Sequence, residues 1–85
     1  MTDLEKRAIT ALQDVKFPSE GWYEKRSRSL WFKMMQFPNA RLVETQAGDL
    51  WFLVWKFRRQ IADAAVVAHA DELLNGAMHL AFEGS

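Results

Sequence analysis

The sequence LWFLVWKFRRQI, residues 50–61, carries seven apolar side chains in its first eight positions and then ends in cations. Those cations are Lys56, Arg58 and Arg59. So wide an apolar surface must be covered by other parts of the protein, because a helix that is apolar nearly all round is normally central. The conformation of residues 39–61 therefore determines the architecture of the whole chain.

Two structures fit this region. In a helix over 39–61, apolar residues recur every three or four positions for about five turns and form one stripe. The stripe consists of Leu42, Gln46, Leu50, Leu53, Val54, Phe57 and Ile61. In a β-hairpin over 41–57, the segments RLVETQ and LWFLVWKF are strands that turn at Ala47, Gly48 and Asp49. We favour the helix because its stripe is long and because Ala-Gly-Asp is a weaker hairpin signal than Asn-Gly.

Two helices are predicted before this region. The first spans 2–16 and begins with Thr2 and Glu5, which have the spacing of a capping box. The second spans 20–36, with Ser19 as its N-cap. Both segments repeat their apolar residues at helical spacing, so each is expected to bury one side.

A fourth helix follows, with Asp63 as its N-cap and Asn75-Gly76 as its end. Beyond it, apolar and other residues alternate as in an extended segment. The alternating apolar residues are Met78, Leu80 and Phe82. The sequence thus predicts an all-α protein, a compact bundle of about four short helices with an extended C-terminal tail, in a single helical domain over 1–85. An α+β fold with the hairpin at 41–57 is the alternative.

The composition is that of a folded domain. Of 85 residues, 49% are hydrophobic and 13% aromatic, which lies outside the disordered range. The absence of cysteine excludes disulfides and thiolate metal sites. No stretch approaches the 18 or more apolar residues of a membrane span, and the first residues lack the apolar core of a signal peptide. We therefore expect a cytoplasmic protein with no membrane contact.

The formal net charge is zero, but the charges are segregated along the chain. Residues 1–24 hold three cations and five carboxylates, and residues 60–85 hold four carboxylates and no lysine or arginine. Residues 25–59 hold eight cations and two carboxylates, a net charge of +6. Such segregation carries information about partners rather than about the fold.

Several motifs resemble one family. They are Phe17-Pro18, Glu24-Lys25-Arg26, Leu42-Val43-Glu44-Thr45-Gln46, the aromatic run Trp51–Trp55, and Lys56-Phe57-Arg58-Arg59-Gln60-Ile61. Together they resemble a pattern of short uncharacterised helical proteins from bacterial and phage genomes. In that pattern a Leu-Thr-x-x-Gln helix start leads through an aromatic stretch to Arg-Tyr-Arg-Arg-Gln-Ile. The resemblance covers residues 17–75 and implies a helix over residues 42–61; it implies no catalytic or ligand residues.

This chain departs from the pattern at three positions. Val43 stands where a capping hydroxyl is usual, Ser27 where an aromatic residue is usual, and Phe57 where tyrosine is usual. Valine has no side-chain oxygen, so the N-terminal cap of the helix that follows is in question.

The residues needed for common catalytic sites are scarce. There is no cysteine and no glycine-rich phosphate loop, and His69 and His79 do not have the spacing of a metal-binding pair. We therefore expect no enzyme, no metal and no cofactor.

The basic block is the best candidate for a binding site. Cations near a helix end also stabilise its macrodipole, by about 0.3–1 kcal/mol each, so part of the block has a structural explanation. Arginine and tryptophan together, however, are typical of interface centres and nucleic-acid grooves. The candidate binding residues are Lys25, Arg26, Arg28, Trp31, Phe32, Lys33, Trp51, Trp55, Arg58 and Arg59.

These residues suggest a small non-enzymatic binding protein, phage or mobile-element encoded, that acts as an inhibitor or adaptor. The aromatic and basic face would bind another protein or a nucleoprotein complex. Direct DNA or RNA binding through residues 25–59 is the alternative, with the helices over 20–36 and 39–61 as a helix-turn-helix-like pair. A homo-oligomer is the third hypothesis, because a thin helical domain has too little interior for all of its aromatic residues.

Overall fold

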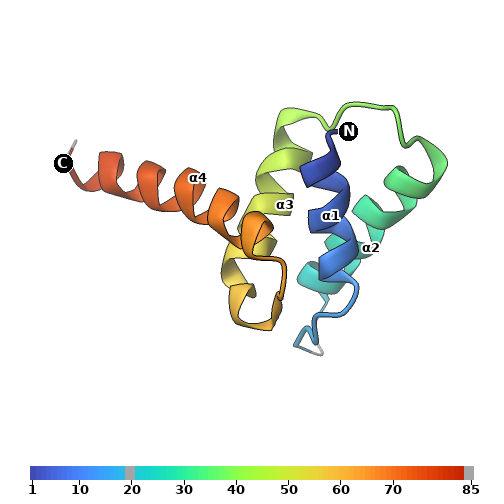
Figure 1. Cartoon of the computed structure of the whole chain (residues 1–85), viewed down its shortest axis with the longest axis horizontal. Coiled ribbons are helices and arrows are strands. Elements are labelled where there is room, and N and C mark those ends of the chain that lie inside the picture. The colour runs from blue at the N-terminus through green and yellow to red at the C-terminus, as the bar shows by residue number, and fades with distance from the viewer. Residues whose placement is uncertain (19–20, 84–85) are drawn as a thin grey trace.

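The computed structural model describes residues 1–18 and 21–83, and residues 75–83 by their backbone alone. The chain forms four α-helices and one short 3₁₀ helix (Figure 1). They are α1 (Asp3–Leu12), α2 (Trp22–Gln36), α3 (Glu44–Lys56), η1 (Arg58–Gln60) and α4 (Ala64–Glu83). No strand occurs in the described residues. The all-α prediction is confirmed, and the hairpin at 41–57 is excluded.

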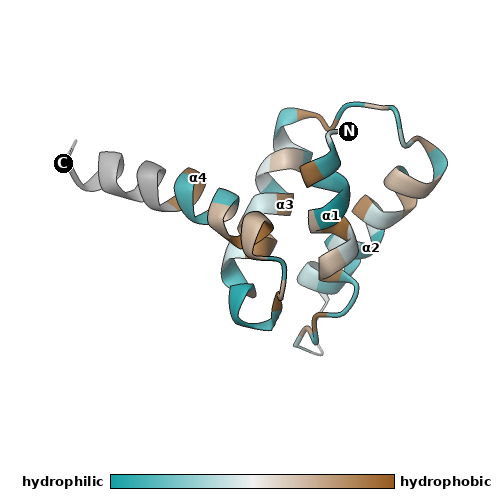
Figure 2. Ribbon diagram, in the orientation of Figure 1, coloured by the Kyte–Doolittle hydropathy of each residue, from teal (hydrophilic) through white to brown (hydrophobic). Residues whose placement is uncertain are grey.

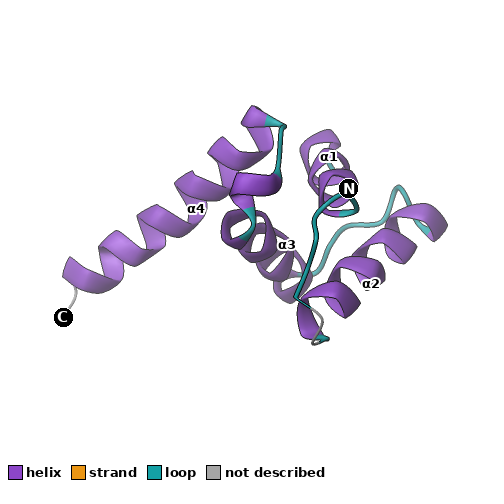
Figure 3. Cartoon of the chain, turned by 90° about the horizontal axis from the view of Figure 1, so that it is seen from below, coloured by secondary structure: helices purple, strands orange, loops and turns teal. Residues whose placement is uncertain are grey.

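The first three helices pack together, and α4 lies against them by its first turns only (Figures 1 and 3). Both α1 and α3 contact all of the other α-helices. Helix α4 leads away from the other three helices, so its C-terminal part extends beyond them (Figures 1 and 3). The result is an elongated molecule of 41 × 29 × 23 Å.

Helix α1 begins as predicted and ends earlier. Its capping box is complete: the Glu5 N–H donates to Thr2 Oγ1 at 3.1 Å, and the Thr2 N–H donates to Glu5 Oε1 at 2.7 Å. The helix ends at Leu12 rather than at residue 16. The N–H groups of residues 13–15 bond to carbonyls three residues back, as in a 3₁₀ turn. This tightening satisfies the last carbonyls of the helix before the chain turns away.

Helix α2 begins at Trp22, after Gly21, and the predicted cap Ser19 lies outside the described residues. Gly21 has a φ of +26°, a left-handed conformation that favours glycine. Ser27, at a position where the resembled family has an aromatic residue, is buried in α2. Its hydroxyl accepts a hydrogen bond from Gln13 Nε2 at 3.3 Å, so the buried polar group has a partner.

Helix α3 has half of a capping box at Val43. The Val43 N–H donates to Gln46 Oε1 at 3.1 Å, whereas the reciprocal bond is absent because valine has no acceptor. The helix ends at Lys56, and Arg58 and Arg59 lie in η1 rather than in the last turn of a helix that reaches residue 61. The predicted end was therefore five residues too late.

Helix α4 has the predicted cap: the Val66 N–H donates to Asp63 Oδ1 at 3.4 Å. It does not end at Asn75-Gly76 but continues to Glu83, so the predicted extended tail is wrong. An interior glycine costs about 1 kcal/mol of helix stability, and the alanine, leucine and methionine that follow favour the helix strongly enough to continue it.

The core fills the space between the four α-helices. In Figure 2, apolar and polar stretches alternate along α1, α2 and α3, as in helices with one buried side. Among the described residues, none of the helices is long and apolar enough to cross a membrane. The buried hydrophobic residues are Ala8, Ile9, Leu12, Val15, Leu30, Met34, Leu50, Trp51, Leu53, Val54, Ile61, Val66 and Ala70.

Candidate interaction face

The predicted aromatic residues differ widely in exposure. Trp51 is only 6% exposed and belongs to the core, where its ring lies edge-on to His69 of α4 with 4.5 Å between centroids. Trp31 and Trp55 are half-buried and pack against the core. Phe32, on the outer side of α2, is 61% exposed. Trp51 is therefore not available to a partner, and its inclusion in the predicted binding residues was wrong.

A chain of aromatic rings joins α2 to α3. Phe57, directly after α3, lies edge-on to Phe17 at 4.9 Å and to Tyr23 at 5.4 Å between centroids. Trp22 continues the chain, at 5.5 Å from Tyr23 and 6.4 Å from Phe52 of α3. Edge-to-face pairs are the preferred geometry of aromatic rings, so these contacts hold the start of α2 on the end of α3.

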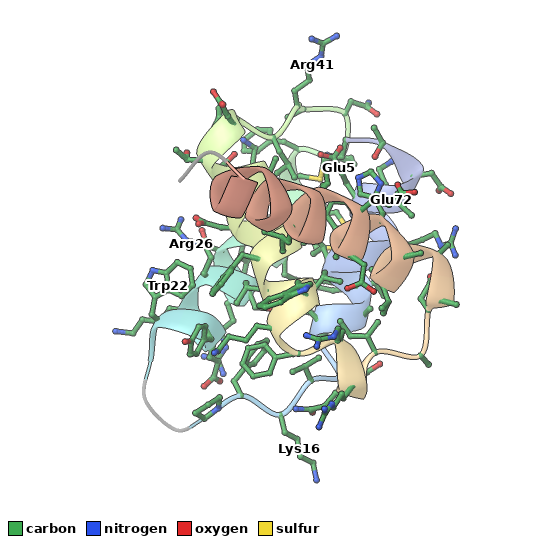
Figure 4. The ribbon with its side chains drawn as sticks, turned by 90° about the vertical axis from the view of Figure 1, so that its left-hand side faces the viewer. Glu5, Lys16, Trp22, Arg26, Arg41 and Glu72 are labelled. Carbon is green, nitrogen blue, oxygen red and sulfur yellow. The ribbon has the colours of Figure 1, made fainter. Side chains whose placement is uncertain are left out.

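Three cations lie over rings of this region. The Arg26 guanidinium is 5.7 Å from the Trp22 centroid, and Lys56 Nζ is 5.4 Å from that of Tyr23. The Arg58 guanidinium is 4.9 Å from the Trp55 centroid. In Figure 4, Trp22 and Arg26 lie together at one edge of the molecule. We call this region the aromatic–basic face and define it by Trp22, Tyr23, Arg26, Phe52, Trp55, Lys56 and Arg58.

Contacts across two helices join most members of the face, because Trp22 of α2 packs on Phe52 of α3 and Lys56 of α3 lies over Tyr23 of α2. Arg26 is also paired with Asp49 of α3, at 3.1 Å. Lys25 borders it: a shallow hollow is lined by Trp22, Lys25, Arg26 and Ser29. The carboxylate of Asp49 and the ring of Trp22 thus hold the Arg26 guanidinium in place.

The other predicted cations lie elsewhere or have structural partners. Arg28 is on the side of α2 that lines a hollow with α1 residues, and it pairs with Glu24 at 2.8 Å, an exposed contact worth about 0.3–0.5 kcal/mol. Lys33 donates to Gln46 Oε1 at 2.6 Å. Arg59 is exposed on η1. The basic block is thus divided between two sides of α2 and the end of α3.

Arg58 has a structural contact as well. Its guanidinium donates to the Trp55 carbonyl at 2.8 Å and so satisfies one of the last acceptors of α3. A macrodipole role for such a cation was predicted from the sequence. Trp22, Tyr23 and Phe52 were not among the predicted binding residues, although the Trp22-Tyr23 dipeptide beside Lys25 and Arg26 indicates the first two.

On another side, an ion pair joins α1 to α4. Arg7 donates from Nε to Asp63 Oδ2 at 2.9 Å and from Nη2 to Asp63 Oδ1 at 2.7 Å. Desolvation raises the pKa of Asp63, but hydrogen bonds from Arg7 and from the N–H groups of Val66 and Ala65, together with the Arg7 charge, outweigh it. The net result is a pKa below the ordinary value of 3.8.

This pKa predicts a pH dependence of stability. A depressed carboxylate pKa stabilises the folded state above about pH 4 and ceases to do so as the pH falls through the folded-state value. Asp63→Asn keeps a capping side chain but loses the ion pair. We expect urea denaturation to show a less stable variant at pH 7, with the difference from wild type shrinking towards pH 2. An equal difference at both pH values would contradict a role for the Asp63 charge.

The remaining candidates for chemistry are few among the side chains that the structure describes. Among these described side chains, no three histidine, aspartate or glutamate residues lie closely enough together to hold a metal ion.

Comparisons of the chain with protein-family models, with curated proteins and with solved structures find no match. The resemblance to short bacterial and phage proteins therefore stays a prediction.

Proposed function

We propose that this chain is a small non-enzymatic binding protein that docks its aromatic–basic face on a protein or nucleoprotein partner and acts as an inhibitor or adaptor. The observation that carries the proposal is the placement of Arg26, Lys56 and Arg58 over aromatic rings of α2 and α3. Arginine and aromatic residues are enriched at the centres of interfaces, where they contribute most of the binding energy.

Order within the face supports tight binding. Immobilising a long side chain on association costs about 0.5–1.5 kcal/mol. Arg26 already lies between Trp22 and Asp49, and Arg58 between the Trp55 ring and carbonyl, so much of this entropy is lost on folding. A partner therefore meets a largely preformed surface.

The charge of the face favours an acidic partner. The face holds the three cations Arg26, Lys56 and Arg58, Lys25 borders it, and Asp49 is the one carboxylate paired within it among the described residues. Positive potential of this kind steers association with a negatively charged surface and weakens with ionic strength. The cytoplasmic location and the phage or mobile-element origin predicted from the sequence belong to the same proposal.

Direct nucleic-acid binding is the second candidate, supported by the exposure of Trp22. This ring is 46% exposed beside Lys25 and Arg26, an arrangement suited to base stacking with phosphate contacts. A helix-turn-helix is less well supported, since residues 37–43 separate α2 from α3 where that motif has a turn of three or four residues.

Charge reversal on the face tests the proposal. In Lys25→Glu/Lys56→Glu both lysines are exposed in the native chain, so folding is expected to persist. We expect capture of the partner from source cells to fall at least about tenfold, or 1.4 kcal/mol, because cations of the interface become carboxylates. Circular dichroism and quantitative mass spectrometry of the captured proteins measure fold and binding.

The matched control is Lys16→Glu/Arg41→Glu, with the same change in net charge. Lys16 and Arg41 are exposed and lie at two ends of the molecule, away from Trp22 and Arg26 (Figure 4). The control variant should bind the partner as wild type does. Equal losses of partner binding in both variants would mean that net charge, not the face, governs binding. Binding of labelled DNA and RNA oligonucleotides tests the nucleic-acid alternative. That alternative requires an affinity for the oligonucleotides that falls steeply between about 50 and 200 mM salt.

A further inference from the structure

One side of α2 faces away from the rest of the protein along the whole helix. In Figures 1 and 3, α2 lies at the outside of the molecule, with α1 and α3 on its inner side. Residues three or four positions apart lie on the same side of a helix. We call the outward residues the exposed side of α2, and each of them is exposed: Trp22, Lys25, Ser29, Phe32 and Gln36.

The exposed side of α2 carries two aromatic rings that the rest of the chain leaves largely open. Trp22 is 46% exposed and Phe32 is 61% exposed. The two residues lie ten positions apart in the sequence, which is about 15 Å along a helix at ~1.5 Å per residue. Two open rings on one side of one helix provide surfaces on which flat molecules can stack.

Cations lie between these rings and beside them. Lys25 belongs to the exposed side itself and forms no ion pair within the described part of the chain. The Arg28 side chain is 69% exposed, and its surface pair with Glu24 is weak enough for a phosphate to replace. Residues 25–43 contain five cations and no aspartate or glutamate. This side of the protein therefore attracts an anion.

A hollow beside Trp22 brings hydrogen-bond donors next to a ring. It is lined by Trp22, Lys25, Arg26 and Ser29 and measures about 210 Å³. The ammonium, guanidinium and hydroxyl groups of the last three residues can all donate to an anion. A pocket that encloses a whole small molecule has roughly 300–1,000 Å³. The hollow therefore suits one charged group of a longer ligand that continues along α2.

We propose that the exposed side of α2 binds single-stranded nucleic acid, with one base stacked on Trp22 and another on Phe32. Lys25 and Arg28 contact the phosphates between these bases. Single-strand sites without sequence preference combine aromatic rings for the bases with cations that follow the backbone. The site goes beyond the proposed docking of a protein, because Phe32 lies outside the aromatic–basic face.

The arrangement fits a nucleic-acid strand better than an anionic membrane or an acidic protein. A helix that lies in a membrane surface keeps its cations away from its apolar side, whereas Lys25 shares one side of α2 with Trp22 and Phe32. The centre of a protein interface encloses large side chains in pockets, and the hollow beside Trp22 is too small for this. A strand alternates bases and phosphates, as this side alternates rings and cations.

Fluorescence anisotropy of short labelled strands with the purified chain tests the site. Oligothymidine DNA and oligouridine RNA represent the two sources of this chemistry, and at least one should bind with a Kd on the order of 10 μM at about 50 mM salt. With two phosphates contacted, the affinity should fall about sevenfold between about 50 and 200 mM salt. A DNA duplex and polyglutamate should compete at least about tenfold less well, since neither offers an unstacked base.

Phe32→Ala separates stacking from charge. Its affinity for the strand should fall at least about fivefold, because one stacked base is lost. The matched control is Phe37→Ala, which removes a ring that is 60% exposed. Five positions correspond to about 140° around a helix, so Phe37 does not share the exposed side of α2. Phe37→Ala should bind the strand as wild type does, and circular dichroism confirms that both variants fold.

Four results would overturn the proposal. They are the absence of binding to either strand at about 500 μM protein and about 50 mM salt, equal competition by the duplex or polyglutamate, unchanged strand binding by Phe32→Ala, and an equal loss in Phe37→Ala. The proposed function is measured separately, as capture of the protein partner from nuclease-treated source cells, which Phe32→Ala should leave unchanged. Strand binding without capture would reject the proposed function alone, and capture without strand binding would reject this site alone.

Discussion

Replacing Trp51 by alanine is expected to lower the free energy of unfolding by about 3–5 kcal/mol. The indole is 6% exposed and packs between α3 and His69 of α4, so its removal leaves a cavity at the contact of the two helices. A chain of 85 residues has a total stability of about 4–13 kcal/mol at the usual 0.05–0.15 per residue. We expect urea denaturation to show that Trp51→Ala loses a large part of this free energy of unfolding.

Trp22→Ala is the matched control, because it deletes the same side chain from the aromatic–basic face. Trp22 is 46% exposed, so we expect a loss of about 1 kcal/mol, from its contacts with Tyr23, Arg26 and Phe52. Trp22→Ala should instead weaken binding of the partner proposed for the aromatic–basic face. Equal destabilisation by the two variants would contradict the assignment of Trp51 to the core and Trp22 to the surface.

Leu53→Ala is expected to cost about 2–5 kcal/mol. Leu53 is fully buried on α3, the helix that contacts α1, α2 and α4, so no single neighbouring helix can move in to fill the space. Thermal denaturation should show a fall in Tm of at least about 8 °C, at 4–8 °C per kcal/mol for a domain of this size.

Leu73→Ala provides the comparison for Leu53. The same methyl groups are removed from a side chain that is nearly half exposed, and the expected loss is under about 1 kcal/mol. If Leu73→Ala were as damaging as Leu53→Ala, the exposure of Leu73 at the edge of the core would be contradicted.

Features that depend on neighbours in the sequence were predicted well. The capping box of Thr2 and Glu5 and the Asp63 cap are local hydrogen bonds between residues three apart, so the spacing alone indicates them. The choice of helix over hairpin for α3 followed from a stripe of helical period. The weak cap at Val43 was also expected, and Gln46 supplies the half that a glutamine can make.

Helix ends were predicted less well because they depend on contacts distant in sequence. The Lys16 N–H donates to Gln60 Oε1 at 2.9 Å, so the segment after α1 and the one after α3 bond to each other instead of continuing their helices. The predicted end of α4 was wrong for a different reason. Asn75-Gly76 favours a helix stop but does not require one, and the residues around it are good helix formers.

For the candidate site, the sequence by itself determined that cations and aromatic rings are concentrated in residues 22–59 and that most carboxylates lie in residues 1–24 and 60–85, since charge and side-chain type are fixed residue by residue. The tertiary structure alone decided that Trp51 is enclosed and Trp22 exposed. An indole has the same hydrophobicity at both positions, and its burial depends on which helix lies over it. Only folding, too, brings Arg26 to Asp49 and Lys56 to Tyr23, because ion pairs and cation–π contacts act over a few ångströms between residues that are far apart along the chain.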